Sequence, residues 1–303
     1  PDRSSETCQV SSATNTIMHP RQILDRYGIA PKQSLGQNFL YDEGLLARIV
    51  AAADLSPGDA VLEIGPGLGA LTRQLAQTAG RVVAVELDDR LLPILRYELE
   101  PFANVEIVHG DILTFDVGAH FDGPFVVVAN VPYYITGAIL RRLLEGRPRP
   151  KRMVMTVQRE VADRLTAKPP RMSLLAVSVQ YYGTVRLVGA VKAGAFWPRP
   201  EVDSAVIRVD VEARPQTTDH RPLSEEMASS VVGRPSSVSD ESFFRVVRAG
   251  FGEKRKQLKN NLRRLGLSDE AIAAALEAAG IDGRRRAETL SVEEWERLVE
   301  ALL

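Results

Sequence analysis

A short apolar run that ends in three closely spaced glycines constrains the fold of this 303-residue chain more than any other feature. Residues 60–64 (AVLEI) have the length and composition of a buried strand, and Gly65-Pro66-Gly67-Leu68-Gly69 follows directly. Apolar residues then recur at helical spacing over residues 70–79. Glycines let a ligand approach the backbone, and a helix N-terminus offers unpaired N–H groups. The pattern therefore predicts a nucleotide-binding corner at the carboxyl end of a strand in an open α/β sheet.

Strand-like and helical segments alternate after this corner. Strands are predicted over residues 81–86, 105–109, 124–129 and 152–157, and helices over residues 88–99, 135–144 and 158–166. The strands are apolar runs without a polar alternation, which is typical of parallel strands covered on both faces. Residues 183–191 and 204–211 are two further strands, expected to pair antiparallel at one edge. The prediction is an open, Rossmann-like α/β sheet of roughly 190 residues.

Composition shifts divide the chain into four segments. They are a flexible tail over residues 1–19, the sheet domain over 20–212, a polar linker or insertion over 213–240, and a small helical domain over 241–303. In the last segment, helical patterns cover residues 241–265, 268–279 and 291–302. Ser291 and Glu294 have the spacing of a capping box at the start of the third.

The overall composition excludes several classes of protein. Hydrophobic residues make up 45% and charged residues 25%, which are globular values. No apolar run reaches the ~18 residues of a membrane helix, and no signal region is recognised, so no membrane association is expected. Cys8 is the sole cysteine, which fits a reducing cytoplasm. The four histidines lack metal-ligand spacing, so no metal site is predicted. Nothing indicates an oligomer, and a monomer is expected.

The ligand of the glycine corner can be narrowed by spacing. Glu86 ends the next strand, 21 residues after Gly65, where a carboxylate would accept hydrogen bonds from a ribose diol. Asp111 follows the third strand and is suited to an adenine amino group. The third glycine, Gly69, comes one residue too early for a dinucleotide fingerprint, and Pro66 stiffens the turn. S-adenosylmethionine fits better than a dinucleotide. The alternative is a tight strand-to-helix corner with purely structural glycines.

Asn130-Val131-Pro132-Tyr133 follows the fourth strand at the same edge of the sheet. An adenine amine is a poor nucleophile because its lone pair is delocalised into the ring. The Asn130 side-chain oxygen and the Val131 carbonyl could accept both amine hydrogens and favour a tetrahedral nitrogen. Pro132 would stiffen the loop, and Tyr133 would stack on a base splayed out of its helix. The alternative is an ordinary turn, since Asn and Pro both form turns.

At this point the sequence resembles a known family, the ribosomal RNA adenine dimethyltransferases. The matching motifs occur in the family's order: KQSLGQNFL (32–40), VLEIGPGLGALT (61–72), VVAVELD (82–88), GDIL (110–113), NVPYYIT (130–136), VQREVADRL (157–165), FWPRPEVDSAV (196–206) and FGEKRKQLKNNL (251–262). The resemblance covers roughly residues 20–212 and 241–298. It implies a Rossmann-like S-adenosylmethionine-dependent methyltransferase sheet with a small all-helical C-terminal domain that binds RNA.

The resemblance also implies roles for individual residues. Those implied to bind S-adenosylmethionine are Asn38, Leu40, Gly65, Gly67, Glu86, Asp111 and Asn130. Asn130, Val131 and Tyr133 would handle the target adenine, with Phe196 stacking on its other face. The implied product is N6,N6-dimethyladenosine at two adjacent adenosines in the 3′-terminal hairpin loop of 16S rRNA within the immature small ribosomal subunit. The helical C-terminal segment and NVPYYIT favour this branch of the family.

Three other functions remain open. They are dimethylation of 23S rRNA in antibiotic resistance, a non-catalytic role in ribosome assembly, and, most distantly, a nicotinamide-dependent oxidoreductase. The Gly69 spacing and the lack of a placed acid–base pair disfavour the last of these. An intact Asn130-Val131-Pro132-Tyr133 motif disfavours a loss of catalysis.

RNA contacts require clusters of positive charge, because Lys+Arg (38) and Asp+Glu (39) nearly balance. Residues 245–264 contain eight Lys or Arg residues and one acidic residue, and residues 141–152 contain six Lys or Arg residues and one acidic residue. The predicted phosphate contacts are Arg248, Lys254, Arg255, Lys256, Lys259, Arg141 and Arg142. Residues 284–286, three consecutive arginines, are a smaller candidate. The alternative for each cluster is a solvated helix face.

Overall fold

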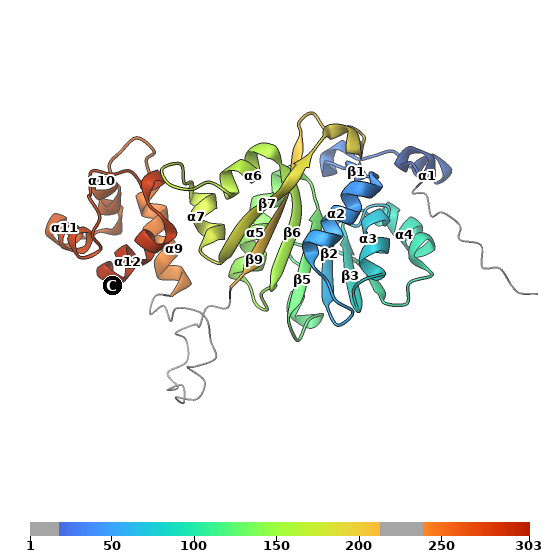
Figure 1. Cartoon of the computed structure of the whole chain (residues 1–303), viewed down its shortest axis with the longest axis horizontal. Coiled ribbons are helices and arrows are strands. Elements are labelled where there is room, and N and C mark those ends of the chain that lie inside the picture. The colour runs from blue at the N-terminus through green and yellow to red at the C-terminus, as the bar shows by residue number, and fades with distance from the viewer. Residues whose placement is uncertain (1–17, 213–238) are drawn as a thin grey trace, which may run out of the picture.

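The computed structural model describes residues 18–212 and 239–303. Nearly all of the predicted tail and of the predicted 213–240 insertion lies outside these residues. The core is a seven-stranded sheet of order β4-β3-β2-β5-β6-β9-β7 (Figure 1). Its strands are β2 (Ala60–Ile64), β3 (Arg81–Glu86), β4 (Val105–His109), β5 (Phe125–Asn130), β6 (Arg152–Gln158), β7 (Gly183–Val191) and β9 (Ser204–Val211).

The first five strands of this order are parallel, and β9 and β7 continue the sheet antiparallel. The predicted α/β fold class and the antiparallel pairing at one edge are both confirmed. The chain runs outward from β2 to β4 and then returns to β5 on the other side of β2. This reversal of strand order makes the carboxyl ends of β2 and β5 the place where a ligand binds in a doubly wound sheet.

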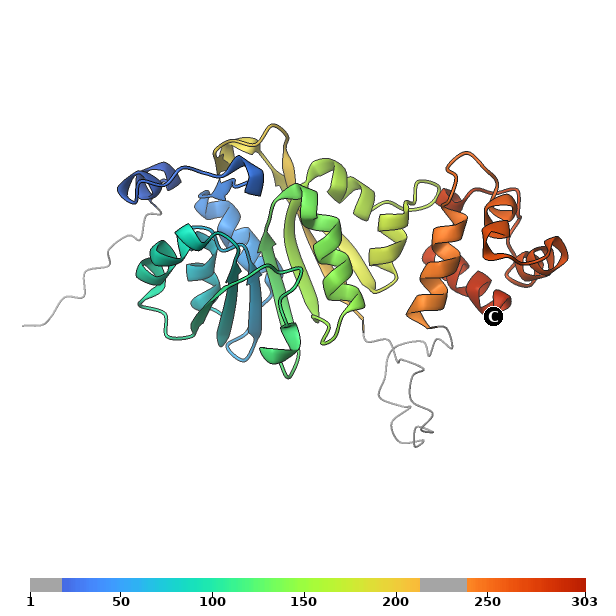
Figure 2. The same ribbon diagram turned by 180° about the vertical axis from the view of Figure 1, so that it is seen from behind.

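Helices cover both faces of the sheet. They are α2 (Glu43–Ala53), α3 (Ala70–Ala76), α4 (Leu92–Leu99), α5 (Thr136–Glu145), α6 (Arg159–Leu165) and α7 (Leu174–Gln180). Consecutive residues of β2 point to opposite faces of the sheet and pack in different apolar clusters. Val61 packs in the cluster of α2 and α3, and Leu62 in the cluster of α5. Figures 1 and 2 show these helices on opposite faces. Burial on both faces explains why the strands lack a polar alternation.

A second, two-stranded sheet lies above the carboxyl edge and was not predicted. It pairs β1 (Phe39–Leu40) with β8 (Phe196–Trp197) antiparallel. Helix α1 (Pro20–Arg26) precedes it at the N-terminal end of the described chain. Strands of two residues have no periodicity that a sequence pattern can detect. The pair joins two segments far apart in the sequence and holds the N-terminal one over the sheet.

The C-terminal part contains α9 (Asp240–Gly250), α10 (Leu258–Leu262), α11 (Asp269–Ala278) and α12 (Val292–Leu302). The prediction of one helix over residues 241–265 is wrong, because the chain leaves the helix after Gly250. The Asn261 amide donates to the Gly250 carbonyl (2.7 Å) and to the Glu253 carbonyl (3.0 Å), which stabilises the intervening turn. Asp240, assigned to the insertion from sequence, is the first residue of α9. The predicted capping box of Ser291 and Glu294 is confirmed.

The C-terminal helices share one apolar core with the sheet. The Phe243 ring of α9 stacks on Tyr181, with centroids 3.9 Å apart. Asp240 pairs with Arg149 of the sheet domain, and the Met172 amide donates to the Glu288 carbonyl (2.9 Å). The helical part is therefore packed against the sheet next to α7 (Figure 2). No helix within residues 18–212 and 239–303 is long and apolar enough to span a membrane.

Candidate active site

One pocket at the carboxyl ends of β2, β3, β4 and β5 collects the residues that were predicted to bind the cofactor and the adenine. All ten line it: Asn38, Leu40, Gly65, Gly67, Glu86, Asp111, Asn130, Val131, Tyr133 and Phe196. They come from six separate segments of the chain. The sheet topology and the β1–β8 pair bring them together.

The glycine turn forms the floor of the pocket. Gly65, Gly67 and Gly69 have φ angles of 68°, 60° and 81°, a left-handed region that other residues enter only with strain. At Gly67 there is also a steric reason, because a Cβ would lie 3.0 Å from Cδ1 of Phe39. The backbone of the turn therefore lies directly against the segment that covers it.

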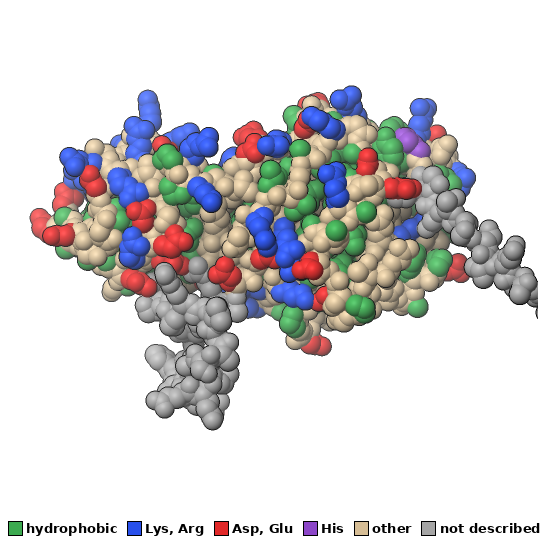
Figure 3. Space-filling model, in the orientation of Figure 1, with side chains coloured by type: hydrophobic (Ala, Val, Ile, Leu, Met, Phe, Trp, Pro, Cys, Tyr) green, Lys and Arg blue, Asp and Glu red, His purple; other side chains and the backbone are tan. Residues whose placement is uncertain are grey.

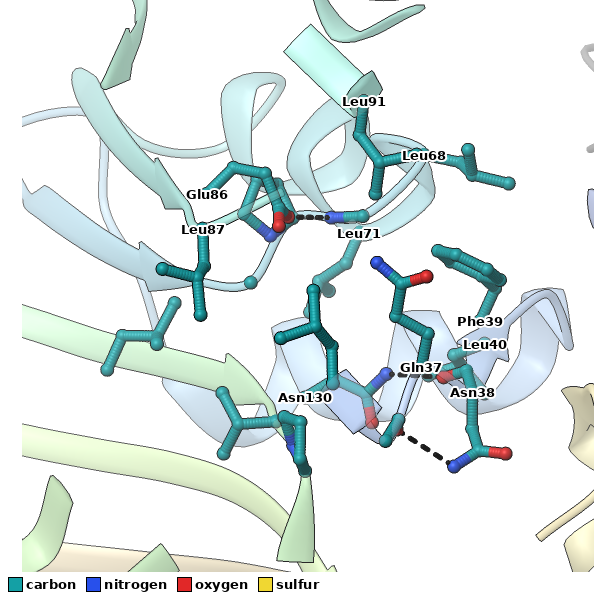
Figure 4. Close-up of a pocket in the computed structure, with 18 of the residues that line it drawn as sticks. Gln37, Asn38, Phe39, Leu40, Leu68, Leu71, Glu86, Leu87, Leu91 and Asn130 are labelled. Carbon is teal, nitrogen blue, oxygen red and sulfur yellow. Dashed lines mark hydrogen bonds between the residues drawn. The ribbon is translucent and has the colours of Figure 1, made fainter. Parts of the chain in front are cut away.

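Glu86 has the geometry of a hydroxyl acceptor. Glu86 is 6% exposed, and its carboxylate is held by two backbone donors. Gly67 N donates to Oε2 (3.1 Å), as Figure 4 shows, and Asp88 N donates to Oε1 (2.8 Å). Burial raises the pKa of Glu86 above its ordinary value. Each carboxylate oxygen can accept a further hydrogen bond, so Oε1 and Oε2 together can accept one from each of the two hydroxyls of a ribose. Asp111, one strand further, uses Oδ1 for the Leu113 amide (2.9 Å) and has a second oxygen for a ligand.

Residues 32–41, here called the strap, cover the pocket and are tied to the end of β3. The buried Asp88 accepts hydrogen bonds from Gln37 Nε2 (2.8 Å) and Lys32 Nζ (3.3 Å) of the strap. Arg90 donates to the same carboxylate (2.6 Å) and holds the pKa of Asp88 far below its usual range. Because the Asp88 amide also binds Glu86, the strap and the ribose acceptor share one anchor. Gln37 and Asp88 belong to two of the matched motifs, but the sequence offered no reason to connect them.

The strap also touches the Asn130 loop. Gly36 has φ = 57°, and a Cβ there would lie 2.9 Å from Cβ of Pro132, so only glycine fits. Asn130 Nδ2 donates to the Asn38 carbonyl (3.4 Å), as Figure 4 shows. With the amide nitrogen directed to the strap, the Asn130 oxygen remains available as an acceptor for a ligand.

The two aromatic residues of the predicted adenine site differ in exposure. The Tyr133 hydroxyl is hydrogen-bonded to the hydroxyl of the buried Ser204 on β9, and burial raises the pKa of the Tyr133 phenol. The Phe196 ring is only 3% exposed and packs in the same cluster as Leu40, its partner in the small sheet. Both rings are therefore held in place before any base arrives.

Glu63, a pocket residue that sequence reasoning missed, lies on β2 beneath the glycine turn. It is 1% exposed, and its Oε2 atom has no hydrogen-bond partner among the described residues. Burial raises the pKa of Glu63 to about 8, so the carboxyl is mostly protonated at neutral pH. The one detectable indication in the sequence was a charged residue inside an otherwise apolar strand.

The predicted RNA contacts are not part of the pocket. In the C-terminal part, Lys256 pairs with Glu253 (2.9 Å), and Arg248 lies over the Phe244 ring, 6.0 Å from its centroid. The remaining predicted residues of that segment, Lys254, Arg255 and Lys259, are exposed. Figure 3 shows Lys and Arg side chains along the upper edge of the C-terminal part. A basic surface is present there, although some of its charge is used within the fold.

On α5, the two predicted phosphate contacts differ. Arg142 donates to the Phe115 carbonyl (2.8 Å), which holds the head of its side chain against the sheet domain. The Arg141 side chain is 67% exposed and lies 3.8 Å from Glu145 one turn later. In the third basic cluster, residues 284–286, Arg285 forms an ion pair with Glu294 (2.6 Å) and so stabilises the C-terminal helices.

The pocket fits S-adenosylmethionine by its chemistry. No Lys or Arg lies among the described residues that line it, so nothing there neutralises a pyrophosphate. Glu86 and Asp111 supply acceptors for a ribose and an adenine amine, and the walls are largely apolar. Acidic and apolar surfaces suit a nucleoside that carries a positive sulfonium. Fold and pocket together define a methyltransferase of the Rossmann-like class.

Comparison with known proteins gives the family. The model of the ribosomal RNA adenine dimethylases matches residues 29–303. A ribosomal RNA small subunit methyltransferase A from Dehalococcoides mccartyi (strain CBDB1) is 44% identical over 292 residues, covering 95% of this chain and 94% of the relative. The protein of the same name from Geobacillus thermodenitrificans is 45% identical, covering 93% and 94%. The chain belongs to the ribosomal RNA adenine dimethylase family, as its motifs indicated.

Solved structures agree with this assignment. The 23S rRNA methyltransferase ErmE is 33% identical, with a TM-score of 0.67 over 88% of this chain and 99% of that one. A dimethyladenosine transferase from Plasmodium falciparum has a TM-score of 0.69 at 24% identity, over 86% and 95%, and supports the fold. The expected cofactor class, S-adenosylmethionine, is consistent with both the family and the pocket.

Proposed function

We propose that this protein transfers methyl groups from S-adenosylmethionine to N6 of two adjacent adenosines in the 3′-terminal hairpin loop of 16S rRNA. The product is N6,N6-dimethyladenosine, formed on the immature small subunit during its biogenesis. The observation that carries the proposal is the position of Asn130, Val131 and Tyr133 in the same pocket as Glu86 and the glycine turn. An amine-accepting loop and a nucleoside-binding corner together suit N6 methylation of adenine.

The chain's own residues prepare the amine. When bound, the cofactor supplies an electrophilic methyl group on a sulfonium. Glu86 and Asp111 hold its adenosine, while the strap residues Asn38 and Leu40 close over it. The Asn130 side-chain oxygen and the Val131 carbonyl accept the two N6 hydrogens and localise the nitrogen lone pair. Tyr133, anchored at Ser204, and Phe196 hold the base from its two faces.

No general base is required for this reaction. The bound cofactor would give up its methyl group to N6 and keep the electrons of the methyl–sulfur bond on sulfur. The methylated nitrogen then loses its proton to water. The site must accept the amine, the monomethylamine and a rotation between them, because each adenosine receives two methyl groups.

The small-subunit substrate is favoured over 23S rRNA by similarity. Relatives with the small-subunit name are more similar to this chain, at 43–45% identity, than the 23S rRNA methyltransferase structure is, at 33%. The exposed side chains Lys254, Arg255 and Lys259 of the C-terminal part would contact phosphates together with Arg248, Lys256 and Arg141. The head of Arg142 is held by the Phe115 carbonyl instead. We propose that the protein acts as a monomer in the cytoplasm, with residues 20–212 as catalytic domain and 241–303 as RNA-binding domain.

The test is methyl transfer from labelled S-adenosylmethionine to purified small subunits that lack the modification, with large subunits and naked RNA in parallel. Nucleoside digestion identifies the product. Dimethyladenosine in small subunits alone is the expected result. Label only in large-subunit RNA would move the protein to the 23S branch, and cofactor binding without any label would favour a non-catalytic assembly factor.

A further inference from the structure

An exposed aromatic ring stands at the mouth of the pocket. Tyr134 is 67% exposed and lines the opening, whereas its neighbour Tyr133 is half-buried and tied to Ser204. Both belong to the 3-10 turn Tyr133–Ile135 that follows the Asn130 loop. Successive residues of such a turn point about 120° apart, which directs the two rings to different places. The Tyr133 ring is held at Ser204 within the pocket, and the Tyr134 ring is left exposed to solvent.

The exposed face continues along α5. Gly137 and Ala138 are exposed and small, and Arg141 follows at helical spacing. A groove between α5 and α7 begins beside these residues, and most of its lining is apolar. Its charged residues are Arg141, Glu145 and, from α6, the exposed Arg164. Small residues leave space between the tyrosine ring and the arginines. An aromatic platform followed by cationic side chains is the usual arrangement for single-stranded nucleic acid.

We propose that Tyr134 stacks on the base adjacent to the target adenosine, and that Arg164 contacts the phosphate of that flanking nucleotide. The inference rests on the proposed function and assigns the substrate subsite beside the catalytic one. Such a subsite would hold the second of two adjacent adenosines while the first is methylated. It would let one docking of the RNA serve both bases.

The first test compares Tyr134→Ala with Tyr134→Phe and with Tyr97→Ala. Tyr97 is 71% exposed on α4, away from the pocket, and so controls for loss of a surface tyrosine. The KM for unmodified small subunits is expected to rise about tenfold in Tyr134→Ala, to return in Tyr134→Phe, and to stay unchanged in Tyr97→Ala. The Kd for S-adenosylmethionine, measured by calorimetry, should stay the same in all three. An unchanged KM in Tyr134→Ala would overturn the proposal.

A second readout needs no methyl transfer. A hairpin RNA carrying 2-aminopurine next to the target adenosine reports stacking through quenching of its fluorescence. The wild type and Tyr134→Phe are expected to quench it, and Tyr134→Ala to leave it bright at saturating protein. Equal quenching in all variants would refute the stacking role. A wild type that quenches the probe but methylates no small subunit would instead refute the proposed function.

The phosphate contact is tested by salt dependence. Arg164→Ala should lower the slope of log affinity against log salt concentration by about 1 for the hairpin RNA. Arg96→Ala, an exposed arginine on α4, should leave the slope unchanged. Equal slopes for Arg164→Ala and the wild type would remove Arg164 from the subsite.

Discussion

The cofactor pocket and the basic C-terminal surface use polar residues in opposite ways. In and directly beside the pocket, charged groups are buried and individually held. Glu86 is held by two backbone amides, and Asp88 by Gln37, Lys32 and Arg90. On the C-terminal surface, charged groups are exposed, and several are partnered only by one another, such as Lys256 with Glu253. A pocket with fixed polar groups is specific for one shape of ligand. A surface with many exposed cations binds the phosphate backbone of RNA through the sum of its charges.

The difference indicates how single substitutions should behave in each region. A buried, held group has no neighbour that can replace it, so its loss removes a defined interaction. An exposed Lys or Arg is one of many within a Debye length of the same phosphates. The RNA affinity that its removal would cost is therefore partly maintained by its neighbours. Effects in the pocket should therefore be large and specific to one ligand, and effects on the surface small, graded and salt-dependent.

Asn130→Ala is expected to have the largest effect. It removes the acceptor proposed to hold an N6 hydrogen, and the rate of transfer should fall by about 10²–10³-fold or more. The Kd for S-adenosylmethionine should change little, because Glu86 and Asp111 remain. Single-turnover transfer to small subunits and calorimetry with the cofactor measure the two quantities. Wild-type activity in Asn130→Ala would disprove the proposed handling of the amine.

Glu86→Gln should affect the other ligand. The Gln side chain has one acceptor oxygen and no charge, so it cannot accept hydrogen bonds from both ribose hydroxyls as the Glu86 carboxylate can. A hydrogen bond to a charged group contributes about 1.5–3 kcal/mol. The Kd for S-adenosylmethionine is therefore expected to rise by about 10- to 100-fold, with a smaller change in the rate at saturating cofactor. Glu98→Gln, on α4 outside the pocket, is a matched control. A rate defect without a change in Kd would contradict the assignment of Glu86 to the ribose.

The same contrast explains what could be predicted from the sequence. Ile64, Glu86 and Asn130 end three parallel strands, and the alternation of elements alone places such ends at one edge. The link from Gln37 to Asp88 could not be predicted, because no periodicity relates residues 51 positions apart. The interruption after Gly250 was missed for a similar reason, since it depends on a side chain eleven residues later, Asn261.

Charge clusters in the sequence were a weaker guide than the pocket motifs. Counting bases over residues 245–264 did not reveal that Arg263 pairs with Asp269 (2.7 Å) or that Arg264 pairs with Glu253 (2.8 Å). Likewise, the head of Arg142 is directed to a carbonyl. Packing decides whether a Lys or Arg side chain faces RNA or an acceptor within the protein. A count of charges along the sequence does not contain this information.

The C-terminal surface is tested by two double variants. Lys254→Ala/Arg255→Ala removes exposed bases, and Arg263→Ala/Arg264→Ala removes bases that pair with acids. The first should lower the salt slope of RNA affinity by up to about 2 and weaken binding roughly tenfold at low salt, with the transfer rate at saturation kept. The second should change the slope less. Filter binding of the hairpin RNA over a series of salt concentrations measures both, and equal slopes would show that internal pairing does not matter.

Glu63 extends the comparison from binding to stability. The folded protein keeps the Glu63 proton up to a pKa of about 8, whereas the unfolded chain releases it near 4.5. Between these values the unfolded state binds fewer protons, so this group lowers the free energy of unfolding as pH rises, by on the order of 1 kcal/mol per pH unit. Glu63→Gln should flatten the decline between pH 5 and 8, measured by denaturant titration without cofactor. Glu277→Gln, an exposed residue on α11, should leave the decline in place. If both variants lose stability with pH as the wild type does, Glu63 ionises normally and the pocket is wetter than its burial indicates.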